Sequence, residues 1–302
     1  MKKLLIFALV ATATLAQAQL MIVDSGQDRV VLLDQNNGSI INGSFITDAA
    51  SATTYDFNLP VMALRVNNEI WVNDRNADAI FRFDTNGSYL SKITDLDDPR
   101  SMALINGEVW VANNNTGNGA TAGTIRRYST AGMFVGDFSG ATNTFGIVEF
   151  NNRLLVGNWD TEDIDQFDLS GNATGQFHSS DGVTGIDNPH QLFAEGNSVW
   201  AAGFGIPTGL YQFDANGNQT NRFDTSGSLG LRGVSRLGNG NMIVSGGTRI
   251  VSINTVLNSN SDLVNQAGTS WQHITSFEAV PEPTTMTLLG LAAFVALRKK
   301  RK

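Results

Sequence analysis

The sequence predicts an all-β fold, a six-bladed β-propeller of four-stranded antiparallel blades whose ring is closed by a C-terminal strand. Three observations predict it. An apolar phrase recurs six times, a second phrase containing a turn follows each copy, and no helical periodicity competes between residues 20 and 280. A repeat of about 40 to 50 residues is typical of propeller blades.

The first phrase is apolar at consecutive positions. Its copies are LMIVDS (20–25), EIWVND (69–74), EVWVAN (108–113), RLLVGN (153–158), SVWAAG (198–203) and NMIVSG (241–246). The equivalent residues Met21, Trp71, Trp110, Leu155, Trp200 and Ile243 are spaced by 50, 39, 45, 45 and 43 residues. Strands that are apolar on successive positions are buried on both faces. We therefore expect these to be second strands, with the tryptophans packed between blades rather than forming a cofactor site.

The second phrase predicts a third strand that ends in a tight turn. Its copies are RVVLLDQNNG, AIFRFDTNG, TIRRYSTAG, DIDQFDLSG, GLYQFDANG and a degenerate RIVSINT. An Asp or Ser side chain caps each turn, and a glycine three or four residues later supplies a positive φ. The capping residues are Asp34, Asp84, Ser129, Asp168 and Asp214, and their glycines are Gly38, Gly87, Gly132, Gly171 and Gly217. We interpret these aspartates as turn residues rather than metal ligands.

Further apolar segments complete each blade. Inner strands precede the first phrase, as in VMALRV (61–66), SMALIN (101–106) and QLFAEG (191–196), and outer strands follow the turn, as in SYLSKIT (88–94). The first copy begins at its second strand, so its inner strand must come from elsewhere or leave an exposed edge. We expect residues 269–277 (TSWQHITSF) to close the ring; the alternative is that they form the outer strand of the sixth blade.

Both ends have the composition of sorting segments that are removed from the mature protein, here called labels. Lys2 and Lys3, the apolar residues 4–15 and the small residues of Ala16-Gln17-Ala18 predict a signal peptide over residues 1–18. At the other end, Pro281, Glu282 and Pro283 precede 12 apolar residues (286–297) and five basic residues (298–302). Twelve residues are short for a stable membrane span, which needs about 20. The predicted domains are therefore the signal peptide (1–18), the propeller (19–279) and a C-terminal tail (280–302).

The order of elements in this tail resembles the PEP-CTERM sorting signal of Gram-negative bacteria. The resemblance implies signal peptidase and exosortase as processing partners, with membrane contact only through the tail before processing. It further implies a final location at the envelope, the outer surface or the extracellular matrix, where exopolysaccharide or matrix proteins are the expected partners.

Net charge and composition exclude several classes of partner for the body of the chain, residues 19–279. Removing both labels leaves 13 basic and 27 acidic residues, hence a net charge near −14. Such a body repels the phosphates of nucleic acids and anionic lipids. The absence of cysteine excludes disulfides and thiolate metal sites.

The repeated phrases resemble those of NHL-repeat and virginiamycin B lyase-like propellers over nearly the whole body. These phrases are structural, so they imply a fold and not an activity. Loops between second and third strands vary greatly among the copies, as at residues 25–29, 114–124, 159–163 and 204–208. Variable loops on a constant scaffold are where binding tends to occur, although neutral drift produces the same pattern.

We predict that the mouth of the central channel, on the same face as these loops, is the ligand-binding site. Second strands end there in Asp24, Asp74, Asn113 and Asn158, and inner strands begin there with Arg100, His190 and Arg232. Such a ring is suited to an anionic sugar or, through its oxygens, to calcium or magnesium. Its charges can also simply pair with one another. We expect no resident cofactor.

The sequence offers little for catalysis. His178, His190 and His273 are the only histidines, and only His190 is expected at the mouth. Resemblance to virginiamycin B lyase implies a histidine base and metal-held carboxylates, and no second mouth histidine is evident. The leading hypothesis is a non-catalytic binding or scaffold module. The alternatives are a metal-dependent lyase or lactonase acting at the channel mouth, and a spacer for display.

Overall fold

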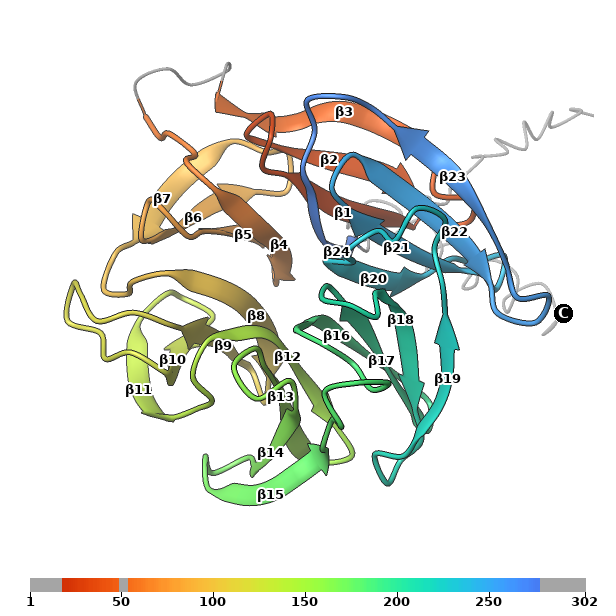
Figure 1. Cartoon of the computed structure of the whole chain (residues 1–302). Coiled ribbons are helices and arrows are strands. Elements are labelled where there is room, and N and C mark those ends of the chain that lie inside the picture. Colours follow the sequence, from red (N-terminus) through yellow and green to blue (C-terminus); the bar gives the residue numbers. More distant parts are fainter. Residues whose placement is uncertain (1–17, 49–53, 278–302) are drawn as a thin grey trace, which may run out of the picture.

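The computed structural model describes residues 18–48 and 54–277. The predicted signal peptide, apart from its last residue, and the predicted sorting tail lie outside the described residues. The described chain forms six four-stranded antiparallel sheets around a central axis (Figure 1). Within these residues, no helix is long and apolar enough to cross a membrane. The predicted fold class is confirmed.

Each sheet is one blade, with its strands in order from the axis outward. The first blade contains β24 (Trp271–Phe277), β1 (Gln19–Asp24), β2 (Arg29–Asp34) and β3 (Ile40–Thr47). The second contains β4 (Pro60–Val66), β5 (Glu69–Asp74), β6 (Ala79–Asp84) and β7 (Tyr89–Ile93). The third contains β8 (Pro99–Ile105), β9 (Glu108–Asn113), β10 (Thr124–Ser129) and β11 (Phe134–Ser139).

The remaining three blades repeat this order. The fourth contains β12 (Thr144–Phe150), β13 (Arg153–Asn158), β14 (Ile164–Asp168) and β15 (Ala173–His178). The fifth contains β16 (Pro189–Glu195), β17 (Ser198–Gly203), β18 (Gly209–Phe213) and β19 (Gln219–Phe223). The sixth contains β20 (Gly233–Arg236), β21 (Met242–Gly246), β22 (Arg249–Asn254) and β23 (Ser259–Asn265). Neighbouring inner strands contact one another around the whole ring (Figure 1).

The ring closes where the two ends of the described chain meet. β24 pairs antiparallel with β1, placing Gln19 opposite Phe277 and Met21 opposite Thr275. This pairing covers the edge that β1 would otherwise expose. The prediction that the C-terminal segment supplies the missing inner strand is confirmed, and the alternative of a sixth-blade outer strand is excluded because β23 holds that position.

Each repeated tryptophan packs between two blades. Trp71 belongs to a buried cluster with Met102 and Val111 of the next blade, and Trp110 to one with Ile147 and Leu154. Trp200 likewise packs against the sixth blade. All three side chains are buried. Their repeated position therefore stabilises the ring, as predicted.

The predicted turns are also confirmed. Asp84 Oδ1 accepts hydrogen bonds from the N–H groups of Asn86 and Ser88, both at 2.8 Å. Asp168 and Asp214 accept equivalent bonds. These amides hold the pKa of all three carboxyls below the usual range, Asn172 and Asn218 having the largest effects on Asp168 and Asp214. The five turn glycines have φ between 76° and 90°.

One side chain links the inner strands of three successive blades. Gln191 of β16 accepts hydrogen bonds at Oε1 from the N–H groups of Val234 (3.0 Å) and Ile274 (2.8 Å), and its Nε2 donates to the Ile274 carbonyl at 2.6 Å. It thereby connects the inner strands of three blades, β16, β20 and β24. Gly233 at the start of β20 permits the close approach of β24, because an added Cβ there would collide with the Gln272 carbonyl oxygen. This link lies one residue inward from the channel mouth.

Candidate functional site

An irregularity at the start of the inner strands shapes the channel mouth. The pairing register shifts between Pro60 and Met62, and at the equivalent places in β8, β12, β16 and β24. A bulge of this kind re-aims the side chain of the extra residue. The bulged positions carry Val61, Arg100, Phe145, His190 and Gln272, and Arg232 holds the equivalent place just before β20.

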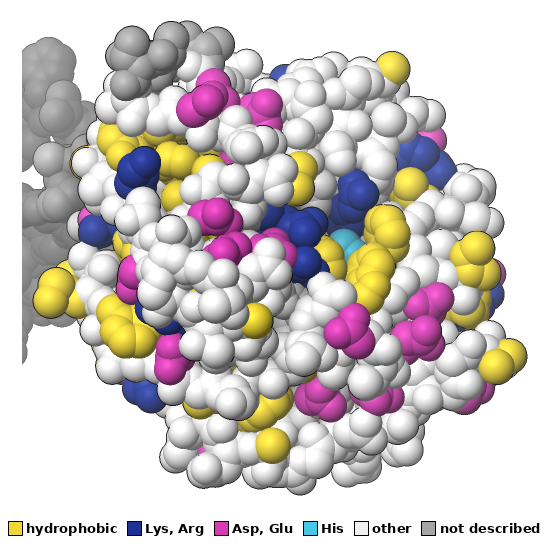
Figure 2. All heavy atoms as spheres, turned by 60° about the vertical axis from the view of Figure 1, so that its left-hand side comes forward, with side chains coloured by type: hydrophobic (Ala, Val, Ile, Leu, Met, Phe, Trp, Pro, Cys, Tyr) yellow, Lys and Arg dark blue, Asp and Glu magenta, His cyan; other side chains and the backbone are white. Residues whose placement is uncertain are grey.

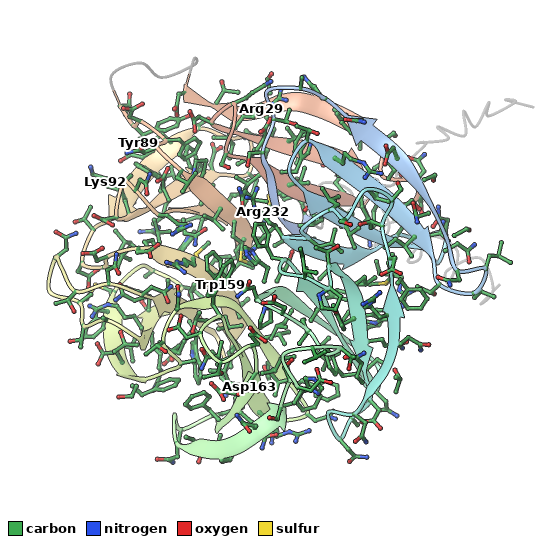
Figure 3. All side chains as sticks on the ribbon, in the orientation of Figure 1. Arg29, Tyr89, Lys92, Trp159, Asp163 and Arg232 are labelled. Carbon is green, nitrogen blue, oxygen red and sulfur yellow. The ribbon has the colours of Figure 1, made fainter. Side chains whose placement is uncertain are left out.

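A hollow of about 200 Å³ lies at the mouth, lined by these residues other than Arg100 and by the loops after the second strands. Its walls are largely aromatic, formed by Phe145, Trp159 and Phe204. Its polar groups come from Arg75, His190, Arg232, Ser270 and Gln272. Figure 2 shows basic groups, an apolar strip and a histidine gathered around this hollow, with acidic groups directly beside the basic cluster and elsewhere on this face. Figure 3 shows Trp159 and Arg232 near the centre of the ring.

His190 lies at the centre of a stack of rings. Its imidazole stacks on Phe145 at 4.3 Å and on Phe204 at 4.9 Å between ring centroids, and the edge of Trp159 lies 5.3 Å away. Burial, followed by the charges of His273 and the nearby arginines, holds the pKa of His190 well below its usual value. The ring is therefore neutral at pH 7. Neither of its nitrogens has a hydrogen-bond partner among the described residues.

Three arginines surround this stack. The Arg100 guanidinium lies 4.1 Å from the centre of the Phe145 ring, and that of Arg75 lies 5.3 Å from it. Both pair with one carboxylate, Asp98, at 2.6 Å from Arg100 and 2.8 Å from Arg75. Two guanidinium groups thus share one carboxylate as an ion-pair partner, and the charge of Asp160 also acts on Arg100.

Arg232 differs from the other two. Its guanidinium lies 5.2 Å from the centre of the Phe204 ring and donates a hydrogen bond to Ser270 Oγ at 2.9 Å. Among the described residues it forms no ion pair with a carboxylate, in contrast to Arg75 and Arg100. Burial, and then repulsion by Arg75, lowers its pKa from the usual value. A half-buried, unpaired guanidinium at the mouth is thus available to a ligand.

The structure brings together only part of the predicted ring. Arg100, His190 and Arg232 meet at the mouth, as the geometry above describes. The predicted residues at the ends of second strands instead hold the loops. Asp74 is buried and accepts hydrogen bonds from the N–H groups of Asn58, Leu59, Asn76 and Ala77. Burial raises its pKa, although these four amides oppose the rise.

Asp24, Asn113 and Asn158 have comparable surroundings. Asp24 accepts from the N–H groups of Gly26 and Ser270 and pairs with Arg29 at 3.0 Å. Asn113 accepts from the Asp97 N–H and donates to two loop carbonyls. Asn158 accepts from the Asp160 N–H at 3.1 Å. Their side chains therefore face loop backbone.

The residues that sequence reasoning missed follow these positions by one. Arg75 follows Asp74, Trp159 follows Asn158, and Phe204 follows Gly203. Side chains alternate along a strand, so a shift of one residue moves a side chain to the other side. A signal existed, because residues 159 and 204 begin two of the loops that differ most among the copies. Phe145 and Gln272 share the bulged position with Arg100 and His190, and aligning the six inner strands would have found them.

The ring closure also places a second histidine near the first. His273 of β24 is buried, and its ring centroid lies 6.4 Å from that of His190. Burial, with repulsion by Arg232, lowers the pKa of His273 to about 3. Within the described residues, no group of three His, Asp or Glu side chains has the geometry to hold a metal ion.

Comparison with known protein families identifies the C-terminal tail. Residues 279–302 match the PEP-CTERM protein-sorting motif. The chain therefore carries this motif, which implies export, sorting to the cell surface of a Gram-negative bacterium and processing by exosortase. No curated protein matches the chain.

Solved structures show the same fold at low sequence identity. The propeller of a nidogen/laminin complex aligns with 86% of this chain and 98% of that chain, with a TM-score of 0.68 and 14% identity. A protein of unknown function from Bacteroides caccae aligns with 87% of this chain and 100% of its own chain, with a TM-score of 0.59 and 12% identity. A catalytically inactive virginiamycin B lyase from Staphylococcus aureus with quinupristin aligns with 84% of this chain and 87% of its own chain, with a TM-score of 0.58 and 14% identity. The neighbours thus include binding and lyase propellers.

Proposed function

We propose that this exported β-propeller is a non-catalytic binding or scaffold module that holds a carbohydrate or protein partner on its loop face. The observation that carries the proposal is the mouth hollow, where three aromatic walls meet Arg75 and Arg232. Aromatic side chains supply apolar contact area, and arginine donates several hydrogen bonds from a rigid fork. Such a combination is suited to holding a ligand at a surface.

The two ends of the chain supply the setting of this function. Cleavage after Ala18 by signal peptidase and processing of the tail at Pro281, Glu282 and Pro283 release the propeller outside the cell. Its partners there are exopolysaccharide or matrix proteins. Asp24, Asp74, Asn113 and Asn158 support the site by positioning the loops that carry the hollow, because their polar atoms bind loop backbone.

Thermal unfolding in the presence of polysaccharides tests the proposal. A ligand that binds only the folded protein stabilises it by about 2.7 kcal/mol at a hundredfold excess over its dissociation constant. We expect at least one extracellular polysaccharide to raise the melting temperature. Trp159→Ala is expected to abolish the shift. Phe134→Ala, which removes an exposed aromatic side chain from the outer strand β11, is the matched control and is expected to keep it.

No shift with any polysaccharide or matrix protein would contradict the proposal. A shift that Trp159→Ala leaves unchanged would place binding elsewhere on the propeller. Each variant is compared with its own ligand-free melting temperature, so a change in stability alone does not imitate a loss of binding.

A metal-dependent lyase or lactonase is the second candidate. The placement of His273 beside His190 favours it, because such an enzyme needs a histidine base and further ligands near it. The three arginines around His190 oppose it, since they repel a cation. A saturable rise in melting temperature with calcium, magnesium or manganese, lost in His190→Gln, would support the enzyme. Turnover that depends on His190 would establish it.

A further inference from the structure

The mouth hollow combines positive charge with apolar walls in a protein whose surface is otherwise acidic. The body between the two labels carries 13 basic and 27 acidic residues. Against this background, Arg75, Arg100 and Arg232 lie around one ring stack, and Asp98 is the only carboxylate paired with any of them within the described part of the chain. The local charge therefore opposes the charge of the whole body and attracts an anion to one place.

The unpaired guanidinium of Arg232 indicates which group of the hollow holds an acidic ligand. Arg100 is buried against Asp98 and Phe145, and Arg75 pairs with Asp98. Arg75 donates to Asp98 through Nε alone, whereas Arg232 forms no ion pair within the described residues and donates to Ser270 Oγ. One guanidinium fork matches one carboxylate with two parallel hydrogen bonds. Arg232 is therefore the group best placed to hold a ligand carboxylate, with Arg75 as a second cation on the same hollow.

The other groups of the hollow restrict the body that carries this carboxylate. Phe145, Trp159 and Phe204 offer apolar surface in a space of about 200 Å³, more than an isolated small anion would fill. The neutral His190 ring has one N–H donor and one acceptor nitrogen, both unpartnered in the described structure, although the ring is only 3% exposed.

Gln272 and Ser270 add further polar groups to the lining of the hollow. Gln272 Nε2 donates to Ser25 Oγ at 2.7 Å, and its Oε1 has no partner assigned by the hydrogen bonds of the described residues. Ser270 Oγ accepts from Arg232. The hollow thus presents a cation, several hydroxyl partners and apolar walls within one small space.

We infer that the mouth hollow binds the carboxylate-bearing sugar residue of an acidic saccharide, with Arg232 holding the carboxylate and the aromatic walls contacting the sugar ring. This inference rests on the proposed function and adds the chemical class of the ligand.

Calorimetric titration of the purified protein tests the inference with four probes. Glucuronate carries both the carboxylate and the sugar ring, whereas glucose lacks the charge and acetate lacks the ring. A short glucuronate oligosaccharide places the same group at a chain end. We expect glucuronate and its oligosaccharide to bind at least tenfold more tightly than glucose or acetate, and to bind more weakly as salt is added.

Two arginine variants identify the site. Arg232→Gln removes the cation while keeping a polar side chain, and we expect it to weaken glucuronate binding at least tenfold. Arg236→Gln is the matched control, because Arg236 lies at the far end of β20, the strand that directly follows Arg232, and pairs with Glu195. It is expected to bind glucuronate within twofold of the unsubstituted protein. Circular dichroism and unfolding midpoints verify that both variants are folded.

The outcomes separate this inference from the proposed function. Equal affinity for glucuronate and glucose, or an unchanged affinity in Arg232→Gln, overturns the inference. If neutral saccharides still bind and depend on Trp159, the proposed function stands without it. If no saccharide or matrix protein binds at all, both fail. A preference for glucuronate that is lost in Arg232→Gln and kept in Arg236→Gln supports both.

Discussion

The Gln191 link makes a quantitative prediction about the closed ring. An inner strand pairs on one side only, so its other edge presents unpaired N–H and C=O groups to the axis. Gln191 satisfies three such groups, the N–H of Val234 and both the N–H and the carbonyl of Ile274. The side chain is 7% exposed, so water cannot readily replace it. Gln191→Met keeps the length of the side chain and removes all three hydrogen bonds.

The expected cost follows from these three groups. Leaving one buried donor or acceptor unsatisfied costs about 1 to 3 kcal/mol, so three cost about 3 to 9 kcal/mol. A domain is typically stable by only about 5 to 15 kcal/mol. The substitution is therefore expected to remove a large part of the stability. It acts on β24, whose pairing with β1 closes the ring.

Urea unfolding followed by circular dichroism measures this cost. Gln219→Met is the matched control, because Gln219 is exposed on the outer strand β19 and its side chain forms no hydrogen bond with the described residues. Its substitution is expected to change the free energy of unfolding by less than about 0.5 kcal/mol. If both variants unfold at the same urea concentration, the link does not stabilise the ring and the reasoning is refuted.

Four further predictions concern packing, turns and pH. Trp110→Ala is expected to lower the free energy of unfolding by about 3 to 5 kcal/mol in urea titrations, because it opens a cavity between two blades. Gly217→Ala is expected to lower the melting temperature, since φ is 83° and the added Cβ would overlap the Phe177 carbonyl oxygen; an unchanged melting temperature would contradict this. Burial raises the pKa of Asp48 to about 6, so the folded state retains this proton and stability falls as the pH rises from about 4 to 6. Asp48→Asn should therefore raise the melting temperature at about pH 7.5 and not at about pH 3.5. The pKa of His273 is lowered to about 3, so stability falls as the pH drops below about 6.5; His273→Gln should flatten this slope in a pH series of melting temperatures, and an unaltered slope would contradict it.

A structural feature can be predicted from this sequence when the residues that specify it lie close together in the chain. Trp71, Trp110 and Trp200 were assigned to inter-blade packing from their repeated position, and their burial confirms it. Strands and turns are specified by residues close together in the sequence, so their patterns are legible in one chain. The closing strand follows from counting strands around the ring, because the first blade lacks an inner strand of its own.

The sequence predicts the candidate site only in part, because the site depends on the direction in which single side chains point. Asp74 and Arg75 are neighbours in sequence, yet one binds loop backbone and the other lines the hollow. The register at the inner-strand bulges decides which side chains meet there, and no sequence pattern revealed the bulges in advance.

The sequence by itself determined the number of blades, the inter-blade tryptophans, the turns and the sorting motif, since each repeats or is contiguous along the chain. Only the tertiary structure decided that Arg232 has no carboxylate partner among the described residues and that His190 lies between Phe145 and Phe204. These facts join residues from different blades. Their distances are set by the closing of the ring, which brings together segments that are far apart in the sequence.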